Sequence, residues 1–175
     1  MTAYRSRADR DSERALYGPV AWLLQPSYWA VRVYRFGQRS KGRRTPVAKL
    51  QHALYFALYS IVRLVTGIDI PRGAHIGHRL MIHHFGGIII HPRARIGDDC
   101  VLRHGVTVGE RSEGGGVPDI GDGVVFGSYA QVLGPIHVGD GARIGSMSVV
   151  LSDVPPGATA VGAPARVLER RHAAD

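Results

Sequence analysis

The sequence predicts an all-β repeat domain, a left-handed parallel β-helix of hexapeptide repeats, preceded by two or three α-helices. Its main signal is an apolar residue at every sixth position, a period that is typical of this β-helix and too short for helical repeats. Glycines recur within the same repeat, where small residues fit turns. In the N-terminal third, apolar residues instead recur at helical spacing. The six-residue positions are Ile70, Ile76, Ile82 and Ile88, then Ile90, Ile96, Leu102 and Val108, and finally Ile120, Phe126, Val132, Val138, Ile144 and Val150.

Length and composition indicate one domain with a small appendage, because 175 residues are enough for one buried core. The single cysteine, Cys100, cannot form an internal disulfide, which suits a reducing compartment. Since it lies in the repeat, we interpret it as a buried core residue rather than a nucleophile. The N-terminus lacks the apolar run that follows the basic start of a signal peptide. No stretch reaches the ~18 uncharged apolar residues of a transmembrane helix. We therefore expect a cytoplasmic protein, with the inner face of the membrane as the alternative location.

The net charge of +8 is concentrated at one end of the chain. Residues 1–66 hold twelve Lys/Arg and three Asp/Glu, whereas the remainder is close to neutral. No base-stacking aromatic motif accompanies these cations, so we do not expect a nucleic-acid partner. An anionic membrane face or an acidic glycan pathway explains the charge equally well.

The basic segment, residues 1–66, is predicted to be helical. Residues 1–15 read as a frayed arm, and residues 16–25 as a weak helix that Pro26 ends. Ser27 can cap a second helix over residues 28–38.

The clearest helix begins at Pro46, runs to about Val65 and stops at Gly67. We expect its apolar stripe to pack against the repeat domain or a neighbouring subunit. The alternative is a helix that lies on a membrane, with Lys49, Arg63 and the basic link before Pro46 facing the lipid. The stripe consists of Val47, Leu50, Leu54, Leu58, Ile61 and Val65, widened by Tyr55, Phe56 and Tyr59.

The β-helix domain is predicted over residues 67–175. A loop is expected over residues 109–119, because residues 110–116 offer no apolar side chain to the core. The coils end after Leu151, and the tail over residues 152–175 is expected to run back over the last coil and protect its edge.

Two histidines and one aspartate stand out under this geometry. His84 follows Ile82 by two residues, near a corner, and Asp69 is expected one coil below Gly87, close to the same corner. An aspartate beside a histidine can fix the imidazole tautomer and support a general base. His104, twenty residues after His84, should stack on it from the next coil. The simpler interpretation is that these histidines are surface residues at a corner of the β-helix. The three-histidine spacing of γ-class carbonic anhydrases is absent, so no metal is expected.

Five segments resemble the serine O-acetyltransferase family, and the resemblance covers about residues 67–170. It includes the two-residue slip in the repeat and the loop after Gly109. The N-terminal third is closer to the family's short polysaccharide-modifying members. The segments are residues 69–77 (DIPRGAHIG), 81–90 (MIHHFGGIII), 105–109 (GVTVG), 144–150 (IGSMSVV) and 162–166 (GAPAR).

The resemblance implies an acetyl-CoA-dependent O-acetyltransferase in which His84 is the general base and Asp69 its partner. The acceptor oxygen attacks the thioester carbonyl directly, without an acyl-enzyme, and backbone N–H groups stabilise the oxyanion. The family binds acetyl-CoA in the groove between two subunits of a homotrimer, and a dimer of trimers is possible. The cofactor contacts carried over are Gly109, Ser128, Tyr129, Ser146, Met147 and Arg166.

Three departures concern the acceptor. This chain has His83 where serine-using members carry Asp, Gly116-Val117 where they carry Arg-His, and Pro92 where they carry Glu. A zwitterionic amino acid needs charged partners, and each unpaired end costs ~1–3 kcal/mol. We therefore expect a saccharide hydroxyl as the acceptor, bound by His83, His104 and Val117. The alternatives are a serine O-acetyltransferase of cysteine biosynthesis and a non-catalytic hexapeptide scaffold.

Overall fold

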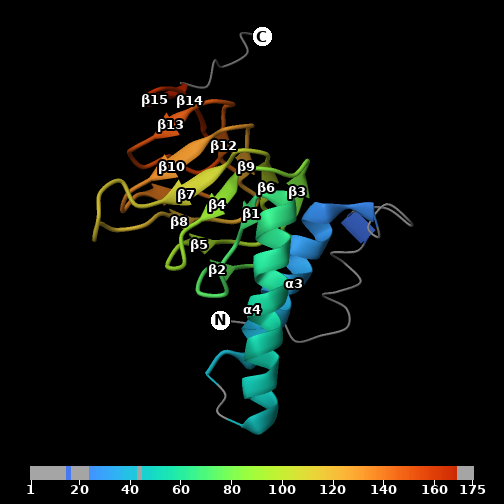
Figure 1. The fold of residues 1–175 in the computed structure, drawn as a ribbon. Helices are drawn as coiled ribbons and strands as arrows, with labels where there is room; N and C mark the ends of the chain where they lie inside the picture. Colours follow the sequence, from blue (N-terminus) through green and yellow to red (C-terminus); the bar gives the residue numbers. More distant parts are fainter. Residues whose placement is uncertain (1–14, 17–23, 43–44, 169–175) are drawn as a thin grey trace.

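The structure, a computed structural model, describes residues 15–16, 24–42 and 45–168. Stacked β-strand coils form one part of the molecule, and two long helices pack at the end where the coils begin (Figure 1). The tail lies at the opposite end of the stack. This arrangement confirms the predicted β-helix of hexapeptide repeats with helices before it. The predicted arm and most of the predicted helix over residues 16–25 lie outside the described residues.

The two helices are α3, Pro26–Ser40, and α4, Pro46–Thr66. Helix α3 begins at Pro26, because proline suits the first helical position, and Gln25 is its N-cap. The expectation that Ser27 caps this helix is therefore wrong, and Ser27 is buried in the first turn. The prediction for α4 is confirmed: the Thr45 side chain accepts from the Ala48 amide, and Gly67 ends the helix with φ 65°.

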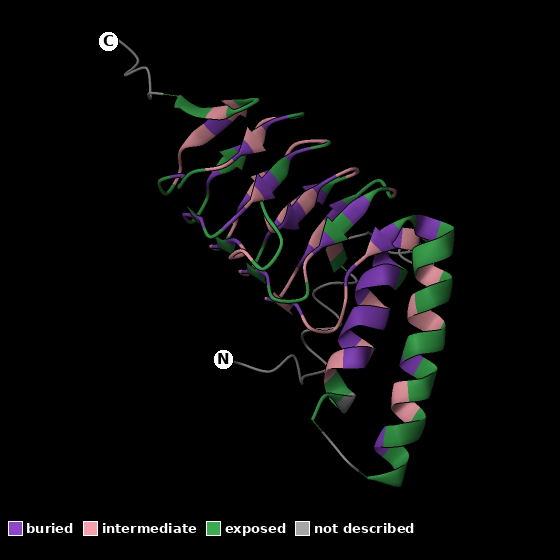
Figure 2. Ribbon diagram, turned by 60° about the vertical axis from the view of Figure 1, so that its left-hand side comes forward, coloured by how far each residue is buried: buried purple, intermediate pink, exposed green. Residues whose placement is uncertain are grey.

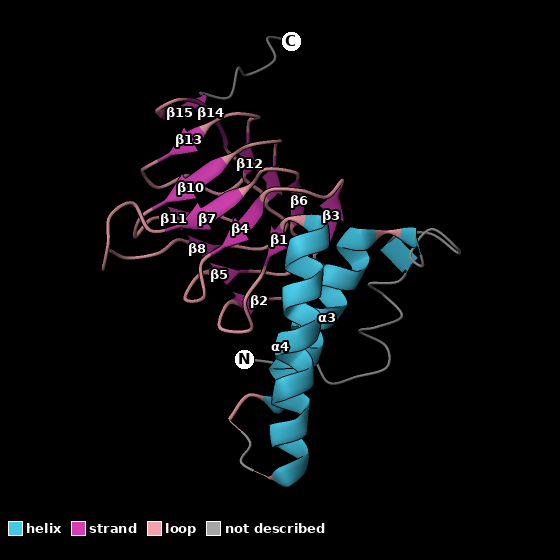
Figure 3. Ribbon diagram, viewed as in Figure 1, coloured by secondary structure: helices cyan, strands magenta, loops and turns pink. Residues whose placement is uncertain are grey.

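Each of the first four coils contributes one short strand to each of three sheets, whereas the last coil makes only an isolated bridge, at Val154, in the second sheet (Figure 3). The first sheet has the order β1-β4-β7-β10-β13, the second β11-β8-β5-β2 and the third β15-β14-β12-β9-β6-β3. All neighbours are parallel except β14 and β15, the antiparallel pair of the tail. The strands are β1 Ile68–Asp69, β2 His75–Ile76, β3 Met81–His83, β4 Ile88–Ile90, β5 Arg95–Ile96, β6 Val101–Arg103, β7 Thr107–Gly109, β8 Asp119–Ile120, β9 Val125–Phe126, β10 Gln131–Leu133, β11 His137–Val138, β12 Arg143–Ile144, β13 Val149–Val150, β14 Thr159–Gly162 and β15 Ala165–Leu168.

The register of the first coil differs from the expectation in one respect. Ile88 pairs with Ile68 rather than with Ile70, so that Asp69 lies opposite Ile89 and not below Gly87. The reason is the position of the two extra residues. They fall in the turn between Ile82 and Ile90, because β3 and β6 pair at a spacing of twenty whereas β4 and β7 pair at eighteen.

Helix α3 closes the open end of the stack (Figure 2, where α3 is the largely buried helix beside the coils). The Tyr34 hydroxyl donates to the Ala74 carbonyl at 2.9 Å. The buried Arg35 guanidinium donates to the Ile76 carbonyl at 2.7 Å, and Gln38 to the Arg72 carbonyl at 2.9 Å. These carbonyls belong to the edge coil, so the helix satisfies groups that an unprotected β edge would leave open.

Helix α4 turns most of its predicted apolar stripe away from the rest of the chain. Its buried residues are Ala48, Tyr55 and Thr66, while Leu50 is 72% exposed and Val65 73%. The expectation that the stripe packs against the repeat domain is therefore wrong, because Tyr55 defines the packed face. Contact with a neighbouring subunit or a membrane stays a prediction. None of the described helices is long and apolar enough to span a membrane.

The packing of α3 on α4 depends on Gly37. A Cβ atom there would lie 2.4 Å from a ring carbon of Tyr55, whose ring is fully buried. Gly→Ala inside a helix normally favours the helix by up to ~1 kcal/mol. Here we expect Gly37→Ala to reduce the free energy of unfolding by about 1–3 kcal/mol, because overpacking outweighs propensity. The midpoint temperature of thermal unfolding, Tm, would fall by about 3–10 °C. Ser60→Ala, at an exposed position of α4, is the control. An unchanged or higher Tm for Gly37→Ala would contradict this packing.

Candidate functional site

The predicted site residues gather mainly at one corner of the β-helix, where each coil passes from the third sheet to the first. Four turns stack there, after β3, β6, β9 and β12. Backbone amides bind the turn below: Tyr129 donates to His104 at 2.9 Å, and Met147 to Ser128 at 2.8 Å. We call this column the corner ladder; its members are His84, His104, Ser128, Tyr129, Ser146 and Met147.

The first turn of the corner ladder is two residues longer than the others. Eight positions separate Ile82 from Ile90, the residue that pairs with Val108, whereas six separate Leu102 from Val108. His84 lies in this enlarged turn with φ 63°, a left-handed conformation that costs a non-glycine residue about 1–3 kcal/mol. Its imidazole is exposed to solvent. The break in the repeat thus coincides with the residue predicted to be the base.

Aromatic rings connect the turns of the corner ladder. The His84 and His104 rings meet edge-on with centroids 5.9 Å apart, which confirms their predicted stacking. His104 in turn meets the Tyr129 ring at 5.0 Å. The Nδ1 atom of His104 is buried and makes no hydrogen bond to any of the described residues.

Asp69 belongs to a different group of contacts. The Tyr59 hydroxyl donates to its Oδ1 atom, and Arg63 Nη1 lies 3.5 Å from Oδ2. Both partners come from α4. In the part of the chain that is described, no hydrogen bond joins Asp69 to His84, so the Asp–His pairing stays a prediction. The register places Asp69 on the sheet face, opposite Ile89 instead of below Gly87.

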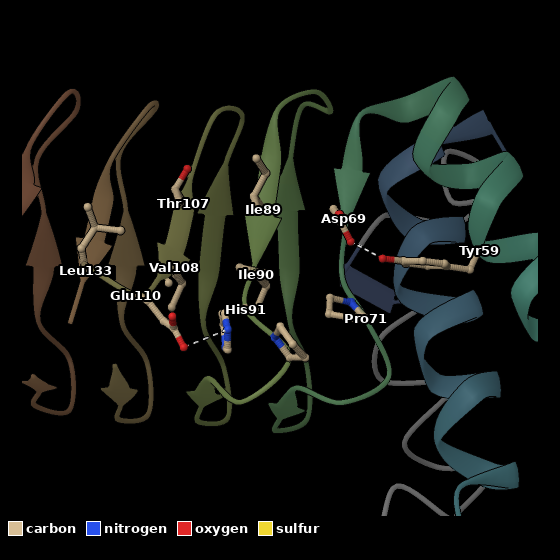
Figure 4. A pocket seen from close by; sticks show the side chains of 12 residues that line it. Tyr59, Asp69, Pro71, Ile89, Ile90, His91, Thr107, Val108, Glu110 and Leu133 are labelled. Carbon is tan, nitrogen blue, oxygen red and sulfur yellow. Dashed lines mark hydrogen bonds and ion pairs between the residues drawn. The ribbon is translucent and has the colours of Figure 1, made fainter. Parts of the chain in front are cut away.

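A pocket of about 480 Å³ lies on the outer face of the first sheet (Figure 4). Asp69 and Tyr59 line one end, and Glu110 and His91 line the other. Its middle is apolar. The predicted residues that line it are Asp69 and Gly109, whereas Tyr59, His91 and Glu110 were not assigned to the site. The remaining lining residues are Pro71, Ile89, Ile90, Pro92, Thr107, Val108 and Leu133.

Glu110 holds the start of the loop between β7 and β8. Its carboxylate accepts from Arg93 and from the Gly114 amide, and it lies 3.4 Å from His91 Nε2. Arg93 also donates to the Gly115 carbonyl at 2.9 Å. These contacts hold the loop at one end of the pocket. Pro92, the position where the resemblance predicts a glutamate, lines the same pocket, so a carboxylate is present in the pocket from another part of the chain.

The other predicted residues lie apart from one another. His83 ends β3 and is exposed, pairing in register with Arg103. Val117 is half-buried in the β7–β8 loop. Arg166 lies exposed on β15, and the tail reaches the corner ladder because the Gly162 amide donates to the Ser148 hydroxyl. Within the described residues, no group of three or more His, Cys, Asp or Glu could hold a metal ion.

Comparison with known proteins places the chain in a family. Residues 118–152 match the family model for bacterial transferase hexapeptide (six repeats). A serine acetyltransferase of Helicobacter pylori is 42% identical over 153 residues, which cover 85% of this chain and 84% of the relative. The chain belongs to the serine acetyltransferase family. It is accordingly an acyltransferase, as the resemblance implied. A Mycobacterium tuberculosis serine acetyltransferase is 45% identical over 64% of this chain and 50% of its own length.

Solved structures of the family agree with the fold. Neisseria gonorrhoeae serine acetyltransferase superposes with a TM-score of 0.79 at 33% identity, covering 93% of this chain and 65% of that one. Soybean serine acetyltransferase complexed with serine gives 0.76 at 35%, covering 92% and 67%. The chain thus spans about two thirds of these longer proteins. These comparisons do not support the expected preference for a saccharide acceptor over serine, because the matched proteins are serine acetyltransferases.

Cys100 is a buried core residue, as expected from its place in the repeat. Its Sγ atom donates to the Gly121 carbonyl at 3.3 Å, and burial raises the pKa of the thiol to about 11. The thiolate is the reactive form, so at pH 8 its population is about 100-fold lower than for a thiol of pKa 9.

We therefore expect native protein to resist Ellman's reagent at pH 8. One thiol per chain should react promptly after guanidinium is added. The 412 nm absorbance of native and unfolded samples, read side by side, measures this. Stoichiometric reaction of the native protein within minutes would mean that Cys100 is accessible.

Proposed function

We propose that the protein transfers the acetyl group of acetyl-CoA to the hydroxyl of L-serine. The observation that carries this proposal is the 42% identity to Helicobacter pylori serine acetyltransferase over most of both chains. Related structures titled as complexes with serine and with CoA support the same pair of substrates. In the reaction the serine oxygen loses its proton and attacks the thioester carbonyl. The C–S bond then breaks, and CoA leaves as the thiol once it has gained a proton.

His84 is the proposed general base. Its exposed imidazole and left-handed backbone in the enlarged turn make it reachable for an acceptor hydroxyl, the first requirement for proton transfer. His104, edge-on to His84, limits how that ring can tilt. Asp69 is proposed to orient and support the base once the substrates and a second subunit complete the site.

Acetyl-CoA is proposed to lie along the corner ladder, in the groove between two subunits of a homotrimer. Tyr129 and Met147 leave 55% and 72% of their surfaces exposed there, which suits contact with the pantetheine arm. Ser128 and Ser146 supply hydroxyl-bearing positions beside it. Gly109, at the end of β7, and Arg166, exposed on β15, are proposed as further contacts, with Arg166 meeting a CoA phosphate.

A saccharide hydroxyl is the second candidate acceptor. The observation that favours it is the set of uncharged or imidazole side chains, His83, Pro92 and Val117, at the positions where serine-using members carry charged groups. A sugar needs hydrogen-bonding groups and no carboxylate clamp. Serine ranks first because the relatives that match most of the chain are serine acetyltransferases.

Substitution of His84 tests the chemistry. We expect His84→Ala to lower kcat by about 10²–10⁴-fold, the usual contribution of a positioned general base, with little change in the KM for acetyl-CoA. Release of the CoA thiol measures both parameters. His137→Ala, at an exposed position on the second sheet, serves as the control with full activity. Equal activity of the two variants would favour the non-catalytic scaffold.

A panel of acceptors tests the substrate. We expect L-serine to give acetyl-CoA turnover at least tenfold above the rates with monosaccharides, oligosaccharides and water. O-acetylserine, identified by mass spectrometry, would establish the product. Turnover with a sugar but not with serine would reject the main proposal and support the second.

A further inference from the structure

We propose that Tyr59 of α4 is a positioning residue that holds the Asp69 carboxylate in its working orientation. This inference rests on the proposed function, in which Asp69 supports His84. Tyr59 donates its hydroxyl hydrogen to Oδ1 of Asp69, while Arg63, one helical turn later, faces Oδ2 at 3.5 Å. Each carboxylate oxygen thus has one partner from the same helix.

The Tyr59 side chain is itself held in place. Its ring stacks on Tyr55, with centroids 5.5 Å apart and planes at 19°. Tyr55 is fully buried, and its hydroxyl accepts from the Arg72 amide at 3.0 Å. The Arg63 guanidinium lies over the Tyr59 ring, 5.9 Å from its centroid. A donor fixed by a buried ring can hold an orientation that a mobile surface side chain could not.

The helix and the carboxylate are also joined through the backbone. Helix α4 ends at Thr66, Gly67 makes the turn, and Asp69 closes β1 two residues later. Thr66 ties this junction together, since its hydroxyl donates to the Val62 carbonyl and accepts from the Ile68 amide. Little backbone freedom therefore remains between Tyr59 and Asp69.

Tyr59 remains a hydrogen-bond donor at every pH at which the enzyme can be assayed. Burial first, and then the hydrogen bond to Asp69, raise the pKa of its hydroxyl to about 12. The phenol therefore keeps its proton and remains a donor to the Asp69 carboxylate.

The location of Tyr59 connects this contact with substrate. Tyr59 and Asp69 line the same end of the pocket in Figure 4, and the Asp69 side chain is 30% exposed. The carboxylate is therefore fixed from the helical side and open on the other. By this inference the helical layer supplies part of the catalytic unit, and Tyr59 acts through Asp69 without touching the reacting atoms.

A double-mutant cycle with Tyr59→Phe and Asp69→Asn tests this role. Phenylalanine keeps the ring stacked on Tyr55 and removes only the hydroxyl. We expect Tyr59→Phe to lower kcat about 3–30-fold and to leave the KM for acetyl-CoA unchanged. In the Asp69→Asn background the same substitution should have no further effect on kcat, because its target is already gone.

Tyr55→Phe is the matched control. It removes another tyrosine hydroxyl from α4, one that binds the Arg72 amide and not Asp69. It should lower Tm while kcat stays at the wild-type value. A merely structural role for Tyr59 would instead give lower Tm without the kcat loss, or equal kcat losses in both backgrounds.

Two failures are distinguishable. An unchanged kcat for Tyr59→Phe, or an equal loss in the Asp69→Asn background, overturns the positioning role while the serine reaction of the wild type stands. Wild-type protein that acetylates a sugar and not serine overturns the substrate, and the cycle is then run on that sugar. Wild-type protein that is inactive with every acceptor overturns both.

Discussion

Residue-by-residue stacking of parallel coils is the constraint on which the site depends. Each outward position lies directly over its counterpart in the coil below, joined by backbone hydrogen bonds such as that from Tyr129 to His104. Side chains that are far apart in sequence therefore form a column whose spacing is set by the backbone. The two extra residues in the His84 turn change that column at one point only, because the coils on either side keep their pairing.

Periodicity predicted what repeats and failed where the repeat is broken. The six-residue rule identified the buried ladder and, through the twenty-residue spacing, the contact of His84 with His104. The six-residue rule could not show which turn contains the two extra residues, because Ile88 and Ile90 are both apolar and either could continue the repeat. For this reason Asp69 was expected below Gly87, whereas it pairs in register with Ile89. Tyr59 was also missed, since a tyrosine within a helical apolar stripe carries no sign that its hydroxyl faces a carboxylate.

The helices complete the β-helix by satisfying polar groups rather than by covering its core alone. An open coil end exposes carbonyls, and a buried guanidinium with several donors suits an array of acceptors. Arg35 does this at β2, with Tyr34 and Gln38 beside it. The same logic extends to Tyr59 and Asp69. These polar contacts determine which side of α4 packs against the β-helix, and they leave the aliphatic stripe of α4 facing outward. Hydrophobicity alone therefore predicted the wrong packed face.

Membership of a family and choice of acceptor depend on different parts of the molecule. The shared coils determine the fold and the place of His84, the proposed base, so identity spread over the chain argues strongly for acyl transfer. The acceptor is selected by the few groups that surround the base. Glu110 lies in the same pocket as Pro92, but Arg93 and His91 already engage its carboxylate. An amino-acid ammonium group would have to compete with those partners, whereas a neutral hydroxyl would not.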